Sequence, residues 1–234
     1  MELSVFPAPE AVATAAADRV ERLLAAKPDA SIALPTGRTP LPFYEELARR
    51  SREGLELGRV RVFNLDELVL PRDDPRSFFA YMRVHAFGPS SLDEKLADIP
   101  SGEARDIPAE CARYEGAVRD AALDLAVLGV GADGHVAYNL PDATAEATHS
   151  VTLPDRIADD LEIPKAARPL GAITMGMGTI RNAHSLLMLA TGTGKRTPVD
   201  ALRRGSRAPE LPCTALLGHP RFELLADQAA AGEG

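Results

Sequence analysis

The sequence is poor in aromatic residues, cysteine and clustered positive charge, and each shortage excludes a class of function. Tryptophan is absent and aromatic residues make up 5% of the chain, which argues against surfaces that bind nucleic acids or carbohydrates by stacking. Cys111 and Cys213 form neither a metal-binding spacing nor a disulfide framework, so a reducing compartment is the simpler interpretation. The formal net charge is −8, and an acidic chain is unsuited to nucleic acids and anionic membranes, because phosphate groups attract clustered lysine and arginine.

Long apolar runs are also missing. No stretch approaches the roughly 18 consecutive apolar residues of a membrane-spanning helix. The N-terminus carries Glu2 and Glu10 and lacks the basic segment and apolar run of a signal peptide. We therefore expect a soluble, cytoplasmic protein. With 45% hydrophobic residues, a chain of 234 residues has ample material for the core of one large domain, and we expect residues 1–234 to form it.

Short apolar runs alternate with longer amphipathic segments along the chain. Strands are predicted at 31–34, 60–65, 123–129, 171–175 and 186–191, with late strands at 215–216 and 222–225. Helices are predicted at 9–27, 40–50, 76–87, 108–120 and 197–204. This alternation predicts an α/β fold with a mostly parallel sheet and helices on both faces. Ligands of such sheets bind at the carboxyl ends of the strands, so the segments that follow the strands matter most.

The loop after the first predicted strand, Pro35-Thr36-Gly37-Arg38-Thr39-Pro40, is suited to binding an anion. A short glycine loop that opens a helix presents backbone N–H groups and the positive end of the helix dipole. Thr36 and Thr39 can add hydroxyl donors, and Arg38 a charged one. The alternative is a simple turn in which Thr39 is the N-cap and Pro40 the first helical residue.

Two adjacent acids, Asp66 and Glu67, follow the second predicted strand in the segment Asn64-Leu65-Asp66-Glu67. Neighbouring side chains of an extended chain point to opposite sides, so only one of them easily faces a cleft. A carboxylate in this place suits a general base that takes a proton next to a carbonyl group. A solvated turn or a helix N-cap is the alternative.

A glycine-rich loop, Gly129-Val130-Gly131-Ala132-Asp133-Gly134-His135, follows the third predicted strand. It contains G-x-G-x-x-G, but we reject a dinucleotide site, because the loop does not follow the first strand and the next residues begin a helix poorly. Asp133 and His135 lie two positions apart, and a nearby carboxylate orients an imidazole and raises its basicity. A structural role is the alternative for this histidine.

The loop after the fifth predicted strand, Thr191-Gly192-Thr193-Gly194-Lys195, resembles half of a P-loop. Leu189 stands where the first glycine of that motif is required, and Arg196 where Ser or Thr is required, so ATP is not inferred. A glycine loop that ends in Lys195 at a helix start still suits a monophosphate. Two anion-binding loops and two acid/base loops at strand ends together predict one cleft for a small phosphorylated molecule.

Taken in order, these segments resemble the glucosamine-6-phosphate deaminase/isomerase family of the 6-phosphogluconolactonase superfamily. The resemblance runs from about residue 5 to about 227 and includes the segments Asp74-Pro75-Arg76-Ser77-Phe78-Phe79 and Thr174-Met175-Gly176-Met177-Gly178-Thr179-Ile180. It implies a Rossmann-like sheet, a lid-like segment near 142–170, and an enzyme that converts an amino-sugar 6-phosphate to a ketose 6-phosphate with release of ammonia.

The resemblance also implies roles for single residues. Asp66 would move a proton between C2 and C1 of the open-chain sugar, and His135, oriented by Asp133, would assist ring opening. The phosphate would be held by Thr36, Gly37, Arg38, Thr39 and Lys195. No metal and no cofactor is implied. The expected partner is a small phosphorylated sugar, with no nucleic acid and no membrane, and the chain is expected to be a monomer or a homo-oligomer.

Three features depart from the family pattern. The deaminases have Asn-Glu-Pro where this chain has Leu140 in the middle position, which removes a carboxylate from the ring-opening set; Asp142 is the nearest substitute. The family's lid carries an arginine that reaches the phosphate, and three basic residues are open candidates here: Arg156, Lys165 and Arg168. Arg38 stands where the family loop usually has glycine.

Leu140 keeps three hypotheses open. The first is a hexosamine-6-phosphate deaminase or isomerase. The second is a lactonase-type hydrolase, in which His135 activates water against a sugar-phosphate lactone, a reaction that needs no acid at position 140. The third is a sugar-phosphate-binding protein that has lost catalysis.

Overall fold

A seven-stranded parallel sheet forms the centre of the structure, a computed structural model that describes residues 1–141 and 143–233. The strand order is β1-β10-β9-β6-β2-β3-β5. The bounds are β1 Glu2–Phe6, β2 Ser31–Leu34, β3 Arg61–Asn64, β5 Ala97–Asp98, β6 Leu125–Gly129, β9 Leu186–Ala190 and β10 Phe222–Asp227. From β2 the chain adds strands in one direction, and from β6 it adds them in the other. The switch point therefore lies between β2 and β6, where such sheets bind ligands.

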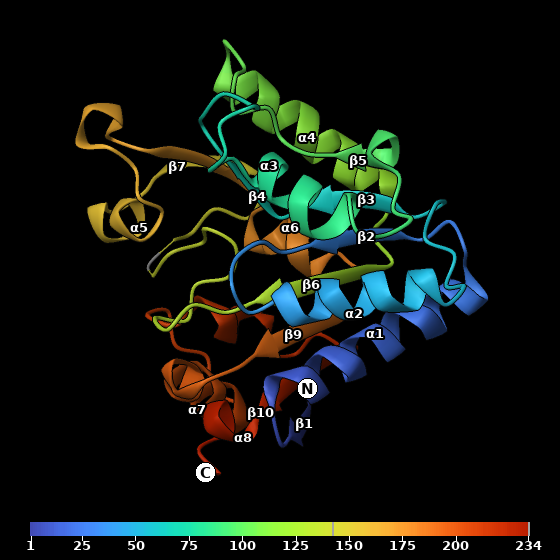
Figure 1. Cartoon of the computed structure of the whole chain (residues 1–234). Helices are drawn as coiled ribbons and strands as arrows, with labels where there is room; N and C mark the ends of the chain where they lie inside the picture. Colours follow the sequence, from blue (N-terminus) through green and yellow to red (C-terminus); the bar gives the residue numbers. More distant parts are fainter. Residues whose placement is uncertain (142, 234) are drawn as a thin grey trace.

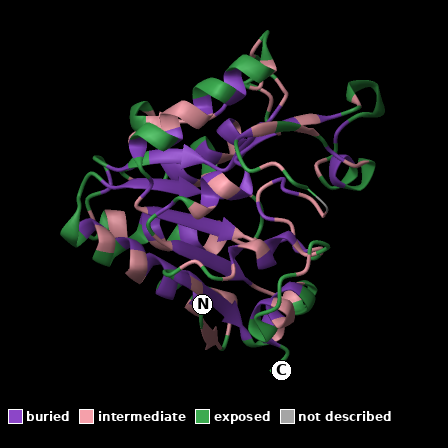
Figure 2. Ribbon diagram, turned by 180° about the vertical axis from the view of Figure 1, so that it is seen from behind, coloured by how far each residue is buried: buried purple, intermediate pink, exposed green. Residues whose placement is uncertain are grey.

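Helices cover both faces of this sheet, as predicted. On one face, strand residues such as Ile32, Val62 and Val127 pack with α1 (Pro9–Ala26) and α2 (Leu41–Arg52). On the other face, Ala33, Phe63 and Leu128 pack with α4 (Ile107–Ala121), α6 (Met177–Arg181), α7 (Arg196–Arg204) and α8 (Gln228–Ala231). The buried strands lie between outer helices that expose one side (Figures 1 and 2). The inner strands β6 and β9 are apolar on both faces, which explains why continuous apolar runs marked them in the sequence.

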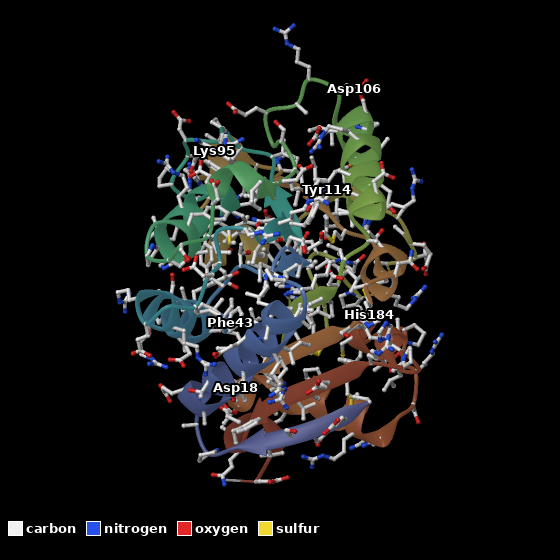
Figure 3. The ribbon with its side chains drawn as sticks, turned by 90° about the vertical axis from the view of Figure 1, so that its right-hand side faces the viewer. Asp18, Phe43, Lys95, Asp106, Tyr114 and His184 are labelled. Carbon is white, nitrogen blue, oxygen red and sulfur yellow. The ribbon has the colours of Figure 1, made fainter. Side chains whose placement is uncertain are left out.

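Figure 3 shows how a helix is oriented on the sheet. Asp106 lies at the start of α4, where its side chain accepts a hydrogen bond from the Ala109 N–H. Tyr114, on the side of α4 that faces the rest of the protein, is fully buried, and its hydroxyl donates to the Asn64 carbonyl at the end of β3. This contact ties α4 to the strand that leads into the predicted acidic segment.

A second, antiparallel sheet of three strands lies beside the first, and the sequence did not predict it. It consists of β4 (Asp66–Leu68), β8 (Gly171–Thr174) and β7 (His149–Thr152) in that order. The acidic segment is thus a strand and not a loop, and the predicted strand at 171–175 belongs to this sheet and not to the parallel one. These strands are short and pair with distant segments, so their sheet has no local signature in the sequence.

An arm projects from the body of the protein in Figure 1, made of β7, α5 (Asp155–Asp160) and the 3-10 helix Lys165–Ala167. It falls in the segment where the family resemblance implies a lid. Its apolar residues Leu153, Ile157 and Ile163 pack against a cluster on the body that includes Leu68 and Phe78. Asp142, the suggested substitute acid, lies outside the described residues.

Four further predictions need correction. The strand β1 was missed, because it is an edge strand that pairs only with β10 from the other end of the chain. Residues 215–216 belong to the 3-10 helix Pro212–Leu216. The helix at 76–87 is divided into α3 (Phe78–Met82) and a π-helical turn, Arg83–Phe87. Pro40 and not Thr39 occupies the cap position of α2.

The remaining predicted elements are confirmed, and a further 3-10 helix spans Glu94–Leu96. No helix in the described part of the chain is long and apolar enough to cross a membrane.

Glu67 joins the second sheet to α3. Its side chain is 3% exposed, and its two carboxylate oxygens accept hydrogen bonds from the backbone N–H groups of Leu68, Phe78 and Phe79 at 2.7, 2.7 and 2.8 Å. Two of these donors open α3, so the carboxylate satisfies N–H groups that a helix start leaves without partners. Glu67 is therefore occupied with the fold, which leaves the cleft to Asp66.

Replacing Glu67 by glutamine is expected to lower the free energy of unfolding by about 1–3 kcal/mol. The amide has one acceptor oxygen in place of two and turns its NH₂ group toward buried N–H donors. Urea denaturation measures the change, and Glu103→Gln at an exposed position is the matched control. Equal stability of the two variants would contradict the anchoring role.

Candidate functional site

A cleft of about 440 Å³ opens at the carboxyl ends of the strands around the switch point. It is bounded by the loops that follow β2, β6 and β9 and by the start of β4. All eight residues predicted from the sequence line it: Thr36, Gly37, Arg38, Thr39, Asp66, Asp133, His135 and Lys195. The volume is within the range of sites that enclose a small molecule. The structure therefore brings together in one cavity residues from four separate segments.

The loop after β2 and the end of the loop after β9 form the positive part of the cleft. Gly37 has φ of 100°, a conformation that glycine adopts readily, and its carbonyl accepts a hydrogen bond from the Tyr81 hydroxyl at 2.7 Å. Burial, and after it the charge of Arg38, lowers the pKa of Lys195 below its usual value. The half-buried Lys195 and the exposed Arg38 thus repel each other at the cleft, and an anion bound there would relieve the repulsion.

Asp227 holds the loop that carries Lys195. The Gly192 N–H lies 3.0 Å from both carboxylate oxygens of Asp227, and the same carboxylate accepts the Ala230 N–H at 2.7 Å at the start of α8. Because Asp227 is 3% exposed, these bonds are shielded from water. The loop is consequently fixed at its start, while Lys195 at its end reaches the cleft.

Asp66 provides a carboxylate to the same cleft. It is the first residue of β4, pairs with Thr174 of β8, and is 6% exposed. Burial, and after it the nearby charge of Glu67, raises the pKa of Asp66 to about 8. A carboxyl group with such a pKa exchanges protons readily near neutral pH, as a general base must. The prediction that only one of the two adjacent acids faces the cleft is confirmed.

His135 and Asp133 form the hydrogen-bonded pair that their spacing predicted. His135 Nδ1 lies 2.6 Å from Asp133 Oδ1, so the carboxylate favours the tautomer with the proton on Nδ1 and leaves Nε2 as an acceptor. Burial lowers the pKa of His135 and outweighs Asp133, which raises it. The imidazole is therefore neutral at pH 7 and able to accept a proton.

Gly131 makes room for this imidazole. A Cβ atom at Gly131 would lie 2.2 Å from the His135 ring, closer than any side chain permits. The Gly131 N–H also donates to the His135 carbonyl at 2.9 Å, which closes the loop on itself. The glycine is thus required by the close approach of the ring and not by a dinucleotide.

Arg156 connects the arm to the histidine pair. Its guanidinium donates to Asp133 Oδ2 at 2.6 Å, on the oxygen that His135 leaves free. Burial would raise the pKa of Asp133, but the His135 charge and the hydrogen bonds from Arg156 and His135 lower it overall. Of the three basic candidates in the lid segment, Arg156 lines the cleft; Arg168 pairs with Asp155 and Asp159, and Lys165 is exposed on the arm.

Position 140 contributes no polar group to the cleft. Leu140 is half-buried and packs against the apolar cluster under the arm that includes Leu68, Phe78 and Tyr138. A carboxylate there would be placed among apolar side chains in this chain, at a high desolvation cost.

Sequence reasoning missed several residues that line the cleft, among them Phe78, Tyr138, Ile157 and Leu161. Tyr138 follows His135 by three positions, and this closeness in the sequence could have indicated it, because the chain after the glycine-rich loop continues along the same cavity. The arm residues had no such signal, since their approach to the cleft depends on tertiary packing. In the described residues, no group of His, Cys, Asp and Glu side chains is arranged to hold a metal ion.

Comparison with known proteins identifies the family. The sequence profile described as "Glucosamine-6-phosphate isomerases/6-phosphogluconolactonase" matches residues 7–224. The glucosamine-6-phosphate deaminase of Pseudarthrobacter chlorophenolicus is 37% identical over 99% of this chain and 92% of its own length. The protein of the same name from Mycolicibacterium smegmatis is also 37% identical, with the same coverage of both chains.

Solved structures agree. A monomeric glucosamine-6-phosphate deaminase superposes with a TM-score of 0.93 at 33% identity, covering 100% of both chains. A 6-phosphogluconolactonase from Trypanosoma brucei has a TM-score of 0.77 at 23% identity, covering 99% of this chain and 97% of that chain, which demonstrates a shared fold. The chain therefore belongs to the family of glucosamine-6-phosphate isomerases and 6-phosphogluconolactonases.

Proposed function

We propose that the protein is a glucosamine-6-phosphate deaminase, which converts the amino-sugar 6-phosphate to a ketose 6-phosphate and ammonia. The observation that carries the proposal is the presence of two cations and a buried carboxylate in one cleft. Arg38 and Lys195 suit a phosphate, and Asp66, with a pKa of about 8, suits proton transfer. The deaminases that match over nearly the whole chain support the same reaction.

Ring opening is assigned to His135. Its neutral Nε2 accepts the proton of the C1 hydroxyl as the bond between C1 and the ring oxygen breaks, and the proton returns to the ring oxygen. Asp133 holds the imidazole in position and stabilises its charged form. Arg156, which donates to the other oxygen of Asp133, fixes the carboxylate in turn.

Proton transfer from C2 to C1 is assigned to Asp66. The carboxylate takes the C2 proton, the electron pair forms a C1–C2 double bond, and the carbonyl pair moves to the C1 oxygen. Return of the proton to C1 lets the nitrogen lone pair form an iminium at C2. Water adds there, one of its protons goes to the C1 oxygen, which becomes the hydroxyl of the ketose, and ammonia leaves. The C–N bond is thus broken hydrolytically, and the enzyme is of the hydrolase class.

The phosphate is assigned to the positive end of the cleft, with Thr36, Gly37, Arg38, Thr39 and Lys195 as its donors. Residues 1–234 act as one unit in this proposal, and the lid-like segment near 142–170 covers the sugar. A monomeric state is supported by the monomeric deaminase that superposes on this chain. A cytoplasmic location and the absence of a cofactor stay predictions.

A lactonase is the second candidate, because a neutral His135 in the cleft could activate water and because lactonases share the fold. That reaction gives no role to the buried carboxylate of Asp66. A sugar-phosphate-binding protein that has lost catalysis, the hypothesis that Leu140 suggested, likewise gives no reason for the raised pKa of Asp66.

The purified protein is tested for ammonia release from amino-sugar phosphates and for acid release from a 6-phosphogluconolactone. Release of ammonia is expected.

Asp66→Asn is expected to lower kcat for ammonia release by about 10²–10⁴-fold, because the amide cannot take the C2 proton. Binding of inorganic phosphate, followed by thermal shift, is expected to persist, since the phosphate loops are unchanged. The same variant is assayed for lactone hydrolysis. An Asp66→Asn protein that releases ammonia at the wild-type rate would exclude Asp66 as the base.

Activity and stability are expected to change with pH in opposite directions. Asp66 must be ionised to act, so kcat/KM is expected to rise with pH until about pH 8. The folded protein binds the Asp66 proton more tightly than the unfolded chain, whose aspartate pKa is about 3.9. The stability due to Asp66 is therefore complete below about pH 4 and lost as the pH rises to about 8. Chemical denaturation at several pH values measures this slope, which Asp66→Asn should reduce.

Lys195→Met is expected to raise KM for the sugar phosphate by about 10–100-fold, because it removes a charged hydrogen bond from the phosphate. The Ki of inorganic phosphate as a competitive inhibitor should rise in parallel. Lys165→Met, which removes the same charge from an exposed position on the arm, is the control. If both variants kept the wild-type KM, the phosphate would have to lie elsewhere.

A further inference from the structure

The Tyr138 side chain lies at the catalytic end of the cleft and has no role in the steps described so far. It lines the cavity and is 8% exposed. Its ring stacks on Phe78, with centroids 6.0 Å apart and planes at 21°, and lies 6.5 Å from the His135 ring. The charge of Asp66 also acts on its hydroxyl. Tyr138 thus has both acid/base residues as neighbours.

Its hydroxyl differs from those of the other tyrosines. The chain has four tyrosines, and the hydroxyls of Tyr44, Tyr81 and Tyr114 donate to the backbone carbonyls of Pro35, Gly37 and Asn64. No hydrogen bond joins the Tyr138 hydroxyl to any of the described residues. The hydroxyl oxygen is nevertheless reached by solvent, unlike the buried polar atoms that have no partner. A buried phenol normally finds a partner, so this one is available to a ligand in the cleft.

The backbone holds this side chain in a fixed position relative to Asp66. The Tyr138 N–H donates to Thr174 Oγ1 at 3.0 Å, and Thr174 is the residue that pairs with Asp66 between β8 and β4. The next residue, Asn139, donates from Nδ2 to the carbonyls of Val136 and Met175 at 2.9 and 2.7 Å. The backbone of Tyr138 and the proposed base, Asp66, are therefore both held by Thr174 of the β4–β8 strand pair.

The phenol is also a donor that keeps its proton. Burial raises the pKa of Tyr138, and the charges of Asp66 and Glu67 raise it further. At the pH where Asp66 acts, the hydroxyl therefore offers a hydrogen bond without ionising. Such a group stabilises negative charge on an oxygen, provided that it is placed where the charge develops.

We propose that Tyr138 is a further catalytic residue, whose hydroxyl donates a hydrogen bond to the C1 oxygen of the open-chain sugar while Asp66 removes the C2 proton. The inference rests on the proposed function. The electron pair of the C2–H bond forms the C1–C2 double bond, the carbonyl pair moves to the C1 oxygen, and the C2 proton goes to Asp66. Tyr138 shares its proton with the charged oxygen and transfers nothing.

The C1 oxygen is the acceptor that fits this location. The proposed function places the phosphate at Arg38 and Lys195 and the sugar carbons C1 and C2 at Asp66 and His135. Leu140 presents no polar group to the cleft, because it packs in the apolar cluster that also supports the Tyr138 ring. A neutral donor at position 138 thus stabilises the enolate that Asp66 generates.

Tyr138→Phe tests the proposal, because it removes one oxygen and keeps the stacking on Phe78. We expect kcat for ammonia release to fall by about 10–100-fold, with KM changed by less than about twofold, since the charge exists only in the transition state. The melting temperature should stay at the wild-type value, because no hydrogen bond within the described residues is lost.

Tyr114→Phe is the matched control and should give the opposite pattern. Its hydroxyl donates to Asn64 inside the fold and does not line the cleft, so the melting temperature should fall while kcat falls far less than in Tyr138→Phe. A lower kcat in Tyr138→Phe that merely tracked a lower melting temperature would overturn the proposal.

An amino-sugar 6-phosphate that carries deuterium at C2 isolates the enolisation step. The isotope effect on kcat for ammonia release should be larger in Tyr138→Phe than in the wild type, because removal of the C2 proton becomes the slow step. If the wild type deaminates and Tyr138→Phe keeps its kcat and isotope effect, or raises KM alone, the role of Tyr138 is wrong and the proposed function stands. If the wild type releases no ammonia, both are wrong.

Discussion

The pairing of β4 with β8 is the interaction on which the geometry of the site depends. After β3 the chain leaves the parallel sheet and pairs Asp66 with Thr174 in antiparallel register. Because side chains alternate along a strand, this register places Asp66 in the cleft and turns Glu67 onto the start of α3. The Thr174 hydroxyl then accepts the Tyr138 N–H, and Met175 accepts the Asn139 amide. A shift of one residue in this pairing would exchange the two acids, leave the helix start without its acceptor and displace the glycine-rich loop.

Burial is the common cause of the chemistry of the site. The chain is acidic overall, so no general positive field attracts a phosphate. Partial burial next to Arg38 makes Lys195 poorly hydrated, while burial raises the pKa of Asp66 and lowers that of His135. Burial thus favours the uncharged form of both acid/base groups. A cavity at the switch point achieves this because strands and loops surround it.

The sequence predicted the parts of the fold and site that depend on local patterns. Continuous apolar runs marked the central strands, and Asp133 and His135 were assigned as a pair because their contact spans two positions. The second sheet and β1 were missed, since Asp66 pairs with Thr174 and β1 pairs with β10, which are partners more than 100 residues away in the sequence. Tyr138 was overlooked for a related reason: nothing in the sequence shows that its hydroxyl, unlike that of Tyr114, has no hydrogen-bond partner among the described residues. Contacts between distant segments decide which polar groups stay free, and those groups define the site.

The arm does more than cover the cleft. Arg156 donates to the Asp133 oxygen that His135 does not use, so the arm contacts the charged partner of the imidazole. Burial first, and the charges of Lys195 and Arg156 after it, lower the pKa of His135. Arg156 lies on the arm, so the arm contributes to this shift through its charge. The arm therefore favours the neutral imidazole, the form that the proposed ring opening requires.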